Sequence, residues 1–429
     1  MERYDVVVIG AGPAGSSSAL VLARSGLSVL LIERGKTVGS KNVFGGRIYS
    51  YPLFDLIANW KKDCPIERYV TKDILSFMTN DQSLTVQYDS PHLGRGKSTS
   101  FTTFRPNFDN WLARKAEAAG ATLITGIRVD DLWLEDGCTK GIIAGNDRVG
   151  ADVVIAADGV VSKFTQKVGL RSETIPEMVS VGVKETIELP ATSIQERFNL
   201  DENEGAACVF VGQPSGGLSG GGFLYTNKNS VSLGIVVSSR DLSQNKTEIY
   251  ALQEGFKRHP MLTRLLKGGK ILEYSSHMIP ELGVKTLEKP YMDGFMATGD
   301  AAGFLINNGY SFRGVDLAIV SGIAAAKTVL TAKKYGNFSK YSLSIYKRLL
   351  RDNRVLPDLK TFKKVPAYLR NPRLFATYPK LLCDIAESIY KVDGMGKQRM
   401  IDAIINEIKK TDTSLLHLLR DLIGGAGSM

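Results

Sequence analysis

A glycine-rich turn between two apolar segments near the N-terminus is the feature that most constrains how this chain can fold. Residues 4–9 (YDVVVI) are predicted to form a buried β-strand, and Gly10, Gly12 and Gly15 follow it at the start of an apolar helical pattern. Residues 27–33 (LSVLLIE) predict a second buried strand. The order strand, glycine turn, helix and strand is a βαβ unit, which indicates a Rossmann-like parallel sheet.

The same residues predict a dinucleotide site. Glycines in this spacing permit a tight turn and bring a pyrophosphate onto the N–H groups at the start of the helix. Glu33, at the end of the second strand, offers a carboxylate to ribose hydroxyls. These residues alone do not distinguish FAD from NAD.

Three later segments contain further motifs that are not expected in a continuous nicotinamide-binding domain. Arg105 directly precedes a helical pattern, and an arginine there can reach a cofactor. Asp158 and Gly159 end one predicted strand, whereas Gly299 and Asp300 end another. Their order and spacing indicate a dinucleotide-binding domain assembled from separate parts of the chain.

The pattern between these parts predicts a second domain. From about residue 176 to 285 short alternating strands prevail, and Asn227 to Ser230 is typical of a hairpin turn. We therefore expect an α/β protein with a Rossmann-like FAD-binding domain, an inserted β-sheet substrate domain and a basic helical C-terminal region. The expected boundaries are 1–75, 100–175 and 286–335 for the first domain, 76–99 and 176–285 for the second, and 336–429 for the third.

Composition and charge exclude several classes of protein. Apolar residues make up 43% of the 429 residues and charged residues 23%, and this balance excludes a disordered chain, a collagen-like chain and a polytopic membrane protein. Residues 340–429 contain 17 Lys and Arg against 9 Asp and Glu. Such a surplus fits anionic lipid, nucleic acid or an acidic protein as a partner, and equally a solvated helical face.

The cysteines and the N-terminus indicate a metal-free protein of the cytoplasm. Cys64, Cys138, Cys208 and Cys383 are scattered without a CxxC motif, so no zinc or four-cysteine iron–sulfur site is expected. The N-terminus lacks the features of a signal peptide, and no uninterrupted apolar stretch reaches the roughly 18 residues of a spanning helix. Contact with a membrane is therefore expected to be peripheral.

The ordered motifs resemble the flavoprotein superfamily of the p-hydroxybenzoate hydroxylase type, whose FAD-binding domain is of the glutathione-reductase-2 type. The resemblance implies that the first glycine motif binds the ADP part of FAD, that the Arg and Asp-Gly motifs lie by the cofactor, and that the Gly-Asp aspartate binds the ribityl chain. It implies that the cofactor-binding residues are Gly10, Gly12, Gly15, Glu33, Arg105, Val129, Asp158, Gly159, Gly299 and Asp300.

Two longer segments narrow the resemblance. Residues 39–49 (GSKNVFGGRIY) and 299–319 are similar to the FixC proteins, relatives of electron-transfer flavoprotein:quinone oxidoreductase, and the similarity extends into 363–379. Geranylgeranyl reductases typically have Cys-Gly-Gly where this chain has Phe44 before two glycines. The resemblance adds to the cofactor site the residues Gly45, Gly46, Gly303, Gly314 and Val315, and the helix after Gly314 is expected to aim its N–H groups at the flavin.

The inserted domain holds the densest glycine cluster of the chain. In quinone-reducing relatives the glycines before the Phe-Leu-Tyr run present N–H groups to a quinone carbonyl, and Gly220 and Gly221 occupy those positions here. Those relatives have a tyrosine where this chain has Ser219. A bulged strand or tight turn is the alternative explanation of the cluster, and the motifs identify no catalytic residue.

The resemblance implies an FAD-dependent electron-transfer subunit that works between a protein partner and a membrane quinone, because flavin passes electrons singly or in pairs. The chain has no ferredoxin domain of its own, so the expected partners are a FixX-type iron–sulfur subunit and a two-subunit electron-transfer flavoprotein, without nucleic acid. Electron flow toward quinone and flow toward ferredoxin by electron bifurcation both stay open. The alternatives are a geranylgeranyl-reductase-like or hydroxylase-like enzyme using NAD(P)H, and a non-catalytic scaffold.

The expected location is the inner face of the cell membrane. Residues 361–391 interleave lysines and arginines with aromatic and aliphatic side chains. Such a segment can attach a protein to anionic headgroups through an apolar face and nearby basic groups. The alternative is that these apolar side chains pack the tail onto the FAD-binding domain.

Overall fold

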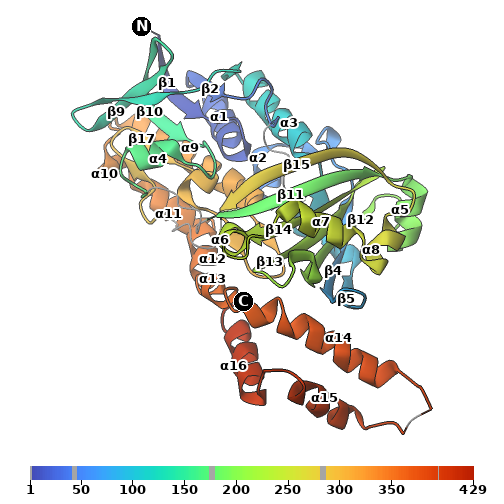
Figure 1. Ribbon diagram of the computed structural model, residues 1–429. Helices are drawn as coiled ribbons and strands as arrows, with labels where there is room; N and C mark the ends of the chain where they lie inside the picture. The colour runs from blue at the N-terminus through green and yellow to red at the C-terminus, as the bar shows by residue number, and fades with distance from the viewer. Residues whose placement is uncertain (1, 41–45, 173–178, 281–286, 395) are drawn as a thin grey trace.

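The protein consists of two large β-sheets with covering helices and a helical tail that extends away from them (Figure 1). This is a computed structural model, and it describes residues 2–40, 46–172, 179–280, 287–394 and 396–429. The α/β architecture with a Rossmann-like domain, a second sheet and a helical C-terminal region confirms the predicted fold class.

The first sheet has a parallel centre of the Rossmann kind, with β1 between β10 and β2. Its strands are β1 (Arg3–Ile9), β2 (Val29–Glu33), β7 (Thr122–Thr125), β8 (Asp131–Glu135), β9 (Cys138–Ala144), β10 (Asp147–Ala156), β16 (Tyr291–Met292) and β17 (Phe295–Ala297). The apolar residues of β1 are consecutive rather than alternating because both faces of the strand are covered: Val6, Val7 and Val8 are fully buried in the core of the first domain.

The register of the parallel strands brings three distant chain segments to one edge. Ile9 pairs with Ala156, and Ala156 pairs with Ala297. Because carboxyl ends of parallel strands lie at the same edge of a sheet, the loops that follow β1, β10 and β17 leave it side by side. These loops contain the glycine turn and the two aspartate motifs.

Two helices from opposite ends of this domain pack very closely. The helices of the domain are α1 (Pro13–Arg24), α2 (Tyr51–Leu56), α3 (Arg105–Ala118), α4 (Lys163–Lys167) and α9 (Val315–Lys334). A Cβ at Gly322 of α9 would lie 2.3 Å from the carbonyl oxygen of Ala14 in α1, so glycine is required there. Among the described residues α9 is the one helix long and apolar enough to cross a membrane, yet 72% of its apolar window is buried inside the fold.

The second sheet is built mostly from the middle of the chain. Its strands are β3 (Arg47–Tyr49), β4 (Tyr69–Met78), β5 (Ser83–Asp89), β6 (Ser100–Thr102), β11 (Val179–Glu188), β12 (Glu204–Gly212), β13 (Gly220–Thr226), β14 (Ser230–Ser238) and β15 (Lys270–Pro280). The predicted hairpin joins β13 to β14, closed by a bond from Asn227 N to Ser230 O. The expected boundary at residues 75 and 76 falls inside β4, which pairs along its whole length with β12.

Four short helices cover one face of this sheet, and their apolar side chains form its core with the strands. These helices are α5 (Ala191–Phe198), α6 (Ser239–Gln244), α7 (Ile249–Lys257) and α8 (Pro260–Leu265). Phe256 of α7 is fully buried and stacks edge-on against Phe210 of β12 at 5.1 Å. This cluster is separate from the core of the first domain.

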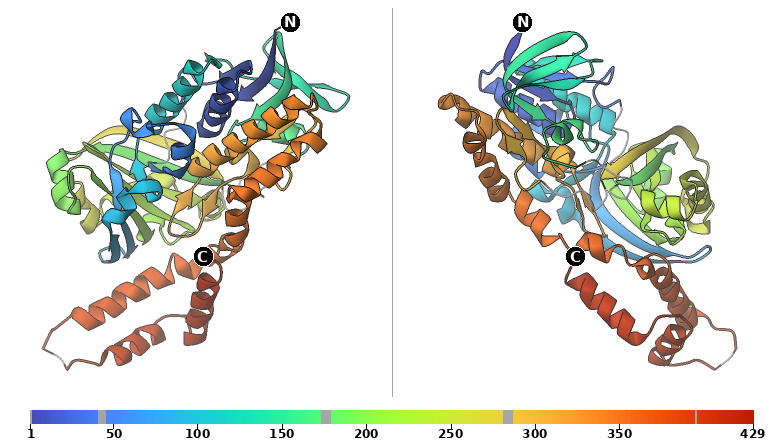
Figure 2. Two further views of the ribbon diagram at one scale, coloured as in Figure 1. Left: turned by 180° about the vertical axis from the view of Figure 1, so that it is seen from behind. Right: turned by 60° about the vertical axis from the view of Figure 1, so that its left-hand side comes forward.

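The tail begins against the first domain and ends in a projecting part, residues 377–394 and 396–429, which we call the arm (Figures 1 and 2). Tyr346 and Leu350 are fully buried in the core of the first domain, which holds the start of the tail in place. Asp421 joins the last helix to the arm's base through Arg373, Tyr378 and Asn371. The tail helices are α10 (Lys340–Leu343), α11 (Ile345–Asp352), α12 (Val355–Thr361), α13 (Val365–Tyr368), α14 (Thr377–Tyr390), α15 (Met400–Lys409) and α16 (Leu415–Ala426).

Candidate functional site

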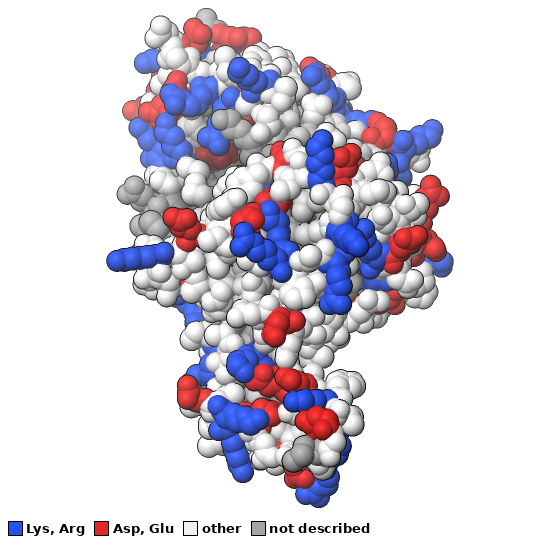
Figure 3. Space-filling model, turned by 45° about the vertical axis from the view of Figure 1, so that its right-hand side comes forward, with Lys and Arg blue, Asp and Glu red and all other residues white. Residues whose placement is uncertain are grey.

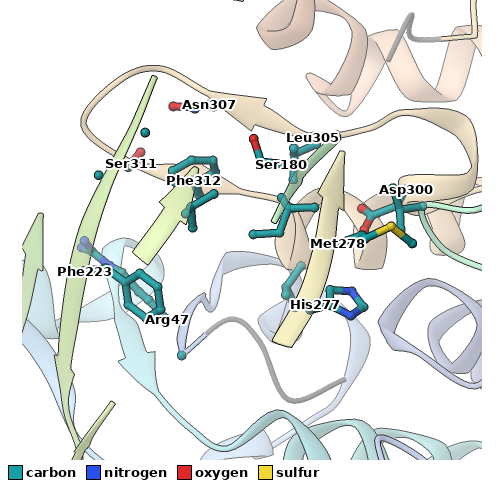
Figure 4. Close-up of a pocket in the computed structure, with 18 of the residues that line it drawn as sticks. Arg47, Ser180, Phe223, His277, Met278, Asp300, Leu305, Asn307, Ser311 and Phe312 are labelled. Atoms are coloured by element: carbon teal, nitrogen blue, oxygen red, sulfur yellow. The ribbon is translucent and has the colours of Figure 1, made fainter. Parts of the chain in front are cut away.

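A cavity of about 550 Å³ lies where the carboxyl edge of the first sheet meets the second sheet and the base of the tail. Figure 4 shows Asp300 and Met278 at one end of this cavity, and Arg47 with Phe223 at the other. Apolar side chains such as Leu305 and Phe312 lie between the two ends. The cavity therefore has one end in each domain.

The glycine turn borders the first end, and its conformation leaves no space for a side chain at Gly10. Gly10 has φ +99°, and a Cβ there would lie 2.4 Å from the carbonyl oxygen of Ala157. Gly12 is the N-cap of α1 and lines the cavity, so the first N–H groups of the helix face it. Glu33 accepts hydrogen bonds from Ala11 N at 3.0 Å and Gly35 N at 2.7 Å, and it thereby ties β2 to the turn.

Two buried carboxylates line the cavity close to this turn. Burial raises the pKa of Asp158 to about 6, and one oxygen, Oδ1, is enclosed without a hydrogen-bond partner among the described residues. Burial also raises the pKa of Asp300, although Arg105 and Arg171 oppose this shift. No described residue donates a hydrogen bond to the Asp300 side chain, which leaves that carboxylate available to a ligand.

Arg105 and Arg171 place positive charge beside these carboxylates. Arg105 forms a two-point ion pair with the fully buried Asp109, at 2.9 Å for both contacts, and this pair fixes the guanidinium at the cavity wall. The three guanidinium nitrogens of Arg171 are buried without a hydrogen-bond partner in the described part of the chain. Burial lowers the pKa of Arg171, and the nearby Asp158 and Asp300 offset this.

The start of α9 forms another wall of the cavity. Gly314 is the N-cap of this helix, and a Cβ there would lie 2.8 Å from Leu305 Cδ1. Arg313 ties the helix start to Asp316 in the first turn and to Asp358 of the tail, both at 2.8 Å. The positive end of the helix dipole therefore points toward the cavity from a rigid position.

Most of the predicted residues line the cavity, and the others are not part of its lining. The predicted residues that line it are Gly12, Gly46, Arg105, Asp158, Gly159, Gly220, Gly221, Asp300, Gly314 and Val315. The predicted residues that are not among its lining are Gly10, Gly15, Glu33, Val129, Gly299 and Gly303. Gly299 and Gly303 have positive φ and shape the loop that presents Asp300, whereas Val129 is buried in the domain core. Gly45 lies outside the described residues.

The glycine cluster of the second domain lies at the start of β13. A Cβ at Gly220 would lie 2.2 Å from the oxygen of Val236, and one at Gly221 would lie 2.5 Å from that of Phe210. These glycines therefore permit close strand packing at the cavity wall. Ser219, which stands where quinone-reducing relatives have tyrosine, donates its N–H to Asp241 at 3.0 Å.

Several residues that the motifs did not single out also line the cavity. Arg47, Asp73 and Tyr225 form a polar group at the end opposite Asp300. His277 of β15 lies in the wall, and burial together with Arg105 and Arg34 lowers its pKa. The side chains that the tail adds to the lining are Pro366, Leu369, Arg370 and Phe375. The period-two alternation of β13 was the signal available for Tyr225, because it places Tyr225 on the same face as Gly221.

This set of groups fits FAD on its own chemistry. A glycine turn opens a helix toward the cavity, and a buried Asp158 oxygen lacks a partner there. Asp300 offers a free carboxylate acceptor, and α9 directs N–H groups from the opposite side. Phosphate, sugar hydroxyls and a flat ring each find a complementary group in this arrangement.

Comparison with known proteins agrees with the motifs. Family models match at residues 5–162 (FAD dependent oxidoreductase), 179–279 (ETF-QO, ubiquinone-binding) and 365–429 (ETF-QO/FixC family C-terminal domain). Protein FixC of Escherichia coli K12 is 44% identical over 424 residues, covering 99% of this chain and 98% of that protein. The probable electron transfer flavoprotein-quinone oxidoreductase YdiS of the same strain is 44% identical over 428 residues, covering 100% and 99%.

Solved structures share the fold at lower sequence identity. A geranylgeranyl bacteriochlorophyll reductase-like protein from Thermoplasma acidophilum superposes with a TM-score of 0.72 at 23% identity, covering 98% of this chain and 100% of that one. The flavin-dependent brominase Bmp2 gives 0.65 at 18% identity, covering 95% and 98%. The combined matches show that the chain is an FAD-dependent oxidoreductase that belongs to the ETF-QO/FixC family.

Proposed function

We propose that this protein uses FAD to pass electrons between a protein partner and a membrane quinone. The observation that carries the proposal is the single cavity that joins the aspartate-lined edge of the first sheet to β12 and β13 of the second. Gly12, Arg105 and Asp158 of the first end lie within residues 5–162, which match as FAD dependent oxidoreductase, and β12 and β13 lie within residues 179–279, which match as ubiquinone-binding. Two ligands that exchange electrons need such adjacent sites.

For FAD we propose the Asp300 end of the cavity. Gly10, Gly12, Gly15 and Glu33 would hold the ADP part, because the turn exposes helix N–H groups and Glu33 lies at its base. When bound, FAD supplies a centre that takes up and releases electrons one or two at a time. Its further contacts would be made by Gly45, Gly46, Arg105, Val129, Asp158, Gly159, Gly299, Asp300, Gly303, Gly314 and Val315.

The start of α9 would influence how readily the bound FAD accepts electrons. Its N–H groups and positive dipole end favour negative charge, which a flavin gathers when it is reduced. Arg313 fixes the helix start through ion pairs with Asp316 and Asp358. The helix dipole is therefore already oriented before the flavin is reduced. We infer that this helix raises the tendency of the bound flavin to accept electrons.

For the quinone we propose the wall formed by β12 and β13. Gly220 and Gly221 line the cavity there without side chains, so a flat ring can approach the backbone closely. The apolar residues of the tail base that line the cavity, such as Leu369 and Phe375, suit the apolar substituents of a membrane quinone. The relatives' names point to the same substrate class.

The electron-donating partner would bring its own metal centre. The described residues contain no group of three or more His, Cys, Asp or Glu that could hold a metal ion. On the strength of the family relationship we propose as partners a separate ferredoxin-like iron–sulfur subunit of the FixX type and a two-subunit electron-transfer flavoprotein, with no role for nucleic acid. Figure 3 shows basic and acidic side chains interspersed on the face that it draws.

We propose peripheral attachment at the inner face of the cell membrane, through the end of the arm. Within 361–391, where an apolar membrane face is expected, Phe375 and Leu381 are buried and Phe375 lines the cavity, whereas Tyr390 is exposed. A set of large apolar side chains is exposed on α15 and α16 of the arm, and it comprises Met400, Ile401, Ile405, Leu415, Leu416, Leu419, Leu422 and Ile423. We call this set the arm patch.

Two features support a membrane as the surface that the arm patch contacts. Lys397, Arg399, Lys409 and Arg420 flank it, as expected for a surface near anionic headgroups. The same arm returns to the cavity, since Gly309 of its lining lies against the C-terminal Met429. A quinone that leaves the bilayer beside the arm would therefore have a short path to its site.

The experiment that tests the proposal compares electron donors. The purified protein is assayed for reduction of a short-chain ubiquinone with its co-purified iron–sulfur and flavoprotein subunits as donor, and in parallel with NADPH. Quinone reduction that depends on the protein subunits supports the proposal. Turnover with NADPH alone would instead favour a reductase or hydroxylase, and turnover with neither would favour a scaffold.

A further inference from the structure

The end of the cavity opposite Asp300 lies against β4, β12 and β13 of the second sheet. In the strand register Ala207 of β12 pairs with Asp73 of β4 on one side and with Tyr225 of β13 on the other. Directly paired residues point to the same face of a sheet, so these three side chains stand in a row. All three residues line the cavity, and alanine is the smallest of them, so the cavity reaches Ala207 between two larger side chains. We call this part of the cavity the hollow over Ala207.

Arg47 closes one side of this hollow with a fixed positive charge. Its guanidinium forms a two-point ion pair with Asp73, with contacts of 2.5 and 3.1 Å, and a third bond of 2.9 Å to Ser100 Oγ. It also lies over the ring of Tyr49, at 4.9 Å from the ring centre. These contacts hold an arginine that would otherwise be mobile, and its charge stays at the cavity wall.

Tyr225 closes the other side with an unused hydroxyl. Its ring packs under the backbone of Gly46, where an added Cβ would lie 2.7 Å from Tyr225 Cδ2, and it lies 5.3 Å from the ring of Phe223. Within the described residues its phenol makes no hydrogen bond. Burial raises the pKa of Tyr225 to about 12, so the phenol keeps its proton and remains a donor.

The neighbouring residues along the two strands are apolar. Two residues further on, Val209 pairs with Phe223, and both line the cavity on the face that carries Ala207 and Tyr225. The end of the cavity thus combines an apolar wall with two hydrogen-bond donors at one point. A quinone ring is complementary to this arrangement, because it has an apolar body and, at its edge, a carbonyl oxygen that accepts hydrogen bonds.

We propose that the hollow over Ala207 binds a carbonyl oxygen of the quinone, with Tyr225 as its hydrogen-bond donor and Arg47 as the adjacent positive charge. This inference rests on the proposed function. Reduction of a quinone to a hydroquinone adds two electrons, taken here from the reduced FAD of that function, and two protons, which come from solvent. Negative charge develops on the oxygen as electrons arrive, and a donor aimed at it favours the transfer. Tyr225 would supply from β13 the phenol that Ser219 does not.

The test uses Tyr225→Phe, which removes one hydroxyl and keeps the ring that packs against Gly46. The FAD-loaded protein is reduced anaerobically and then mixed in a stopped-flow instrument with a short-chain ubiquinone or with ferricenium. Ferricenium accepts one electron and has no carbonyl oxygen, so it reports electron transfer without the proposed contact. Tyr88→Phe is the matched control, because Tyr88 is exposed on β5 and does not line the cavity.

The expected result is a selective defect. In Tyr225→Phe, reoxidation by ubiquinone slows by roughly tenfold to a hundredfold, the size of a hydrogen bond to a charged group. Reoxidation by ferricenium, FAD content and the visible flavin spectrum stay as in the wild type, and Tyr88→Phe changes none of these. Ala207→Val, which fills the hollow, is expected to impair ubiquinone reoxidation in the same selective way.

Two results would overturn the inference. Wild-type ubiquinone rates in both Tyr225→Phe and Ala207→Val would remove the hollow from the quinone site. An equal loss with both acceptors would assign Tyr225 a structural role only. Failure of the proposed function is distinguishable, because the wild type itself would then react with ferricenium but not with ubiquinone, and the inference would fall with it.

Discussion

Gly15 lies directly against the carbonyl oxygen of Gly10, and a Cβ at position 15 would come within 1.9 Å of that oxygen. The turn therefore has no space for even the smallest side chain. Because this oxygen is backbone, it cannot move aside without displacing the turn that begins α1. The first glycine motif is thus required by packing as well as by any ligand.

Substitution at this contact should damage both the turn and cofactor retention. We expect Gly15→Ala to lower the free energy of unfolding by about 1–3 kcal/mol, the usual cost of overpacking, and to purify with little FAD. The flavin absorbance per mole of protein and the thermal midpoint measure the two effects. Gly150→Ala is the control, since a Cβ there meets Arg3 at an ordinary 3.5 Å; equal FAD content in the Gly15 variant and this control would contradict the assignment.

Asp300 should contribute to FAD affinity through a single hydrogen bond. Its buried carboxylate accepts no hydrogen bond from the described residues, so a ribityl hydroxyl is its expected partner. Asp300→Ala would lose about 1.5–3 kcal/mol, which weakens FAD binding by roughly tenfold to a hundredfold. Titration of the FAD-free protein with FAD measures this, with the exposed Asp147→Ala as control; unchanged affinity would remove Asp300 from the site.

Asp158 predicts a pH dependence of stability in the FAD-free protein. Its pKa is about 6 in the folded protein and about 3.8 when unfolded, so between these values the folded state holds a proton that the unfolded state has released. Stability therefore falls as pH rises from about 4 to 6 and stays lowered above that, by at most about 3 kcal/mol. Asp158→Asn should be more stable than the wild type at pH 8 and similar at pH 4. Thermal midpoints that differ by the same amount at both values would contradict this.

Much of this site could be predicted from the sequence because its motifs are local. The turn at Gly10, the end of β2 at Glu33 and the ends of β10 and β17 each show their role in a few consecutive residues, and parallel pairing then brings them together. The pairing of Asp73 with Ala207 and of Ala207 with Tyr225 is different in kind. It joins three distant segments, and no single segment carries a pattern that indicates it.

The tail shows a second limit of local reasoning. Basic and aromatic residues alternate in 361–391, and that pattern is typical both of a membrane surface and of a helix packed on a protein. The distinction depends on which side chains the rest of the fold covers. Phe375 and Leu381 are covered, whereas Leu416 and Ile423 of α16 are exposed.

The arm patch should determine binding to membranes. Leu416 and Ile423 are 77% and 72% exposed, and inserting either side chain into a bilayer contributes about 1.5–3 kcal/mol. We expect the wild type to float with anionic vesicles at low salt and less so at high salt. Leu416→Glu and Ile423→Glu should each weaken flotation roughly tenfold or more, whereas Tyr341→Glu, an 84% exposed site on α10, should not. Equal flotation of all four proteins would exclude the arm patch.

The most direct test of electron transfer to quinone is the stoichiometry of quinol formation in a single turnover. The FAD-loaded protein is reduced with one equivalent of dithionite under anaerobic conditions, freed of excess reductant and mixed with a short-chain ubiquinone, and the quinol is quantified by chromatography. The account predicts one quinol for each FAD oxidised. Reduced FAD that persists beside unreacted quinone, in protein that ferricenium still reoxidises, would contradict it.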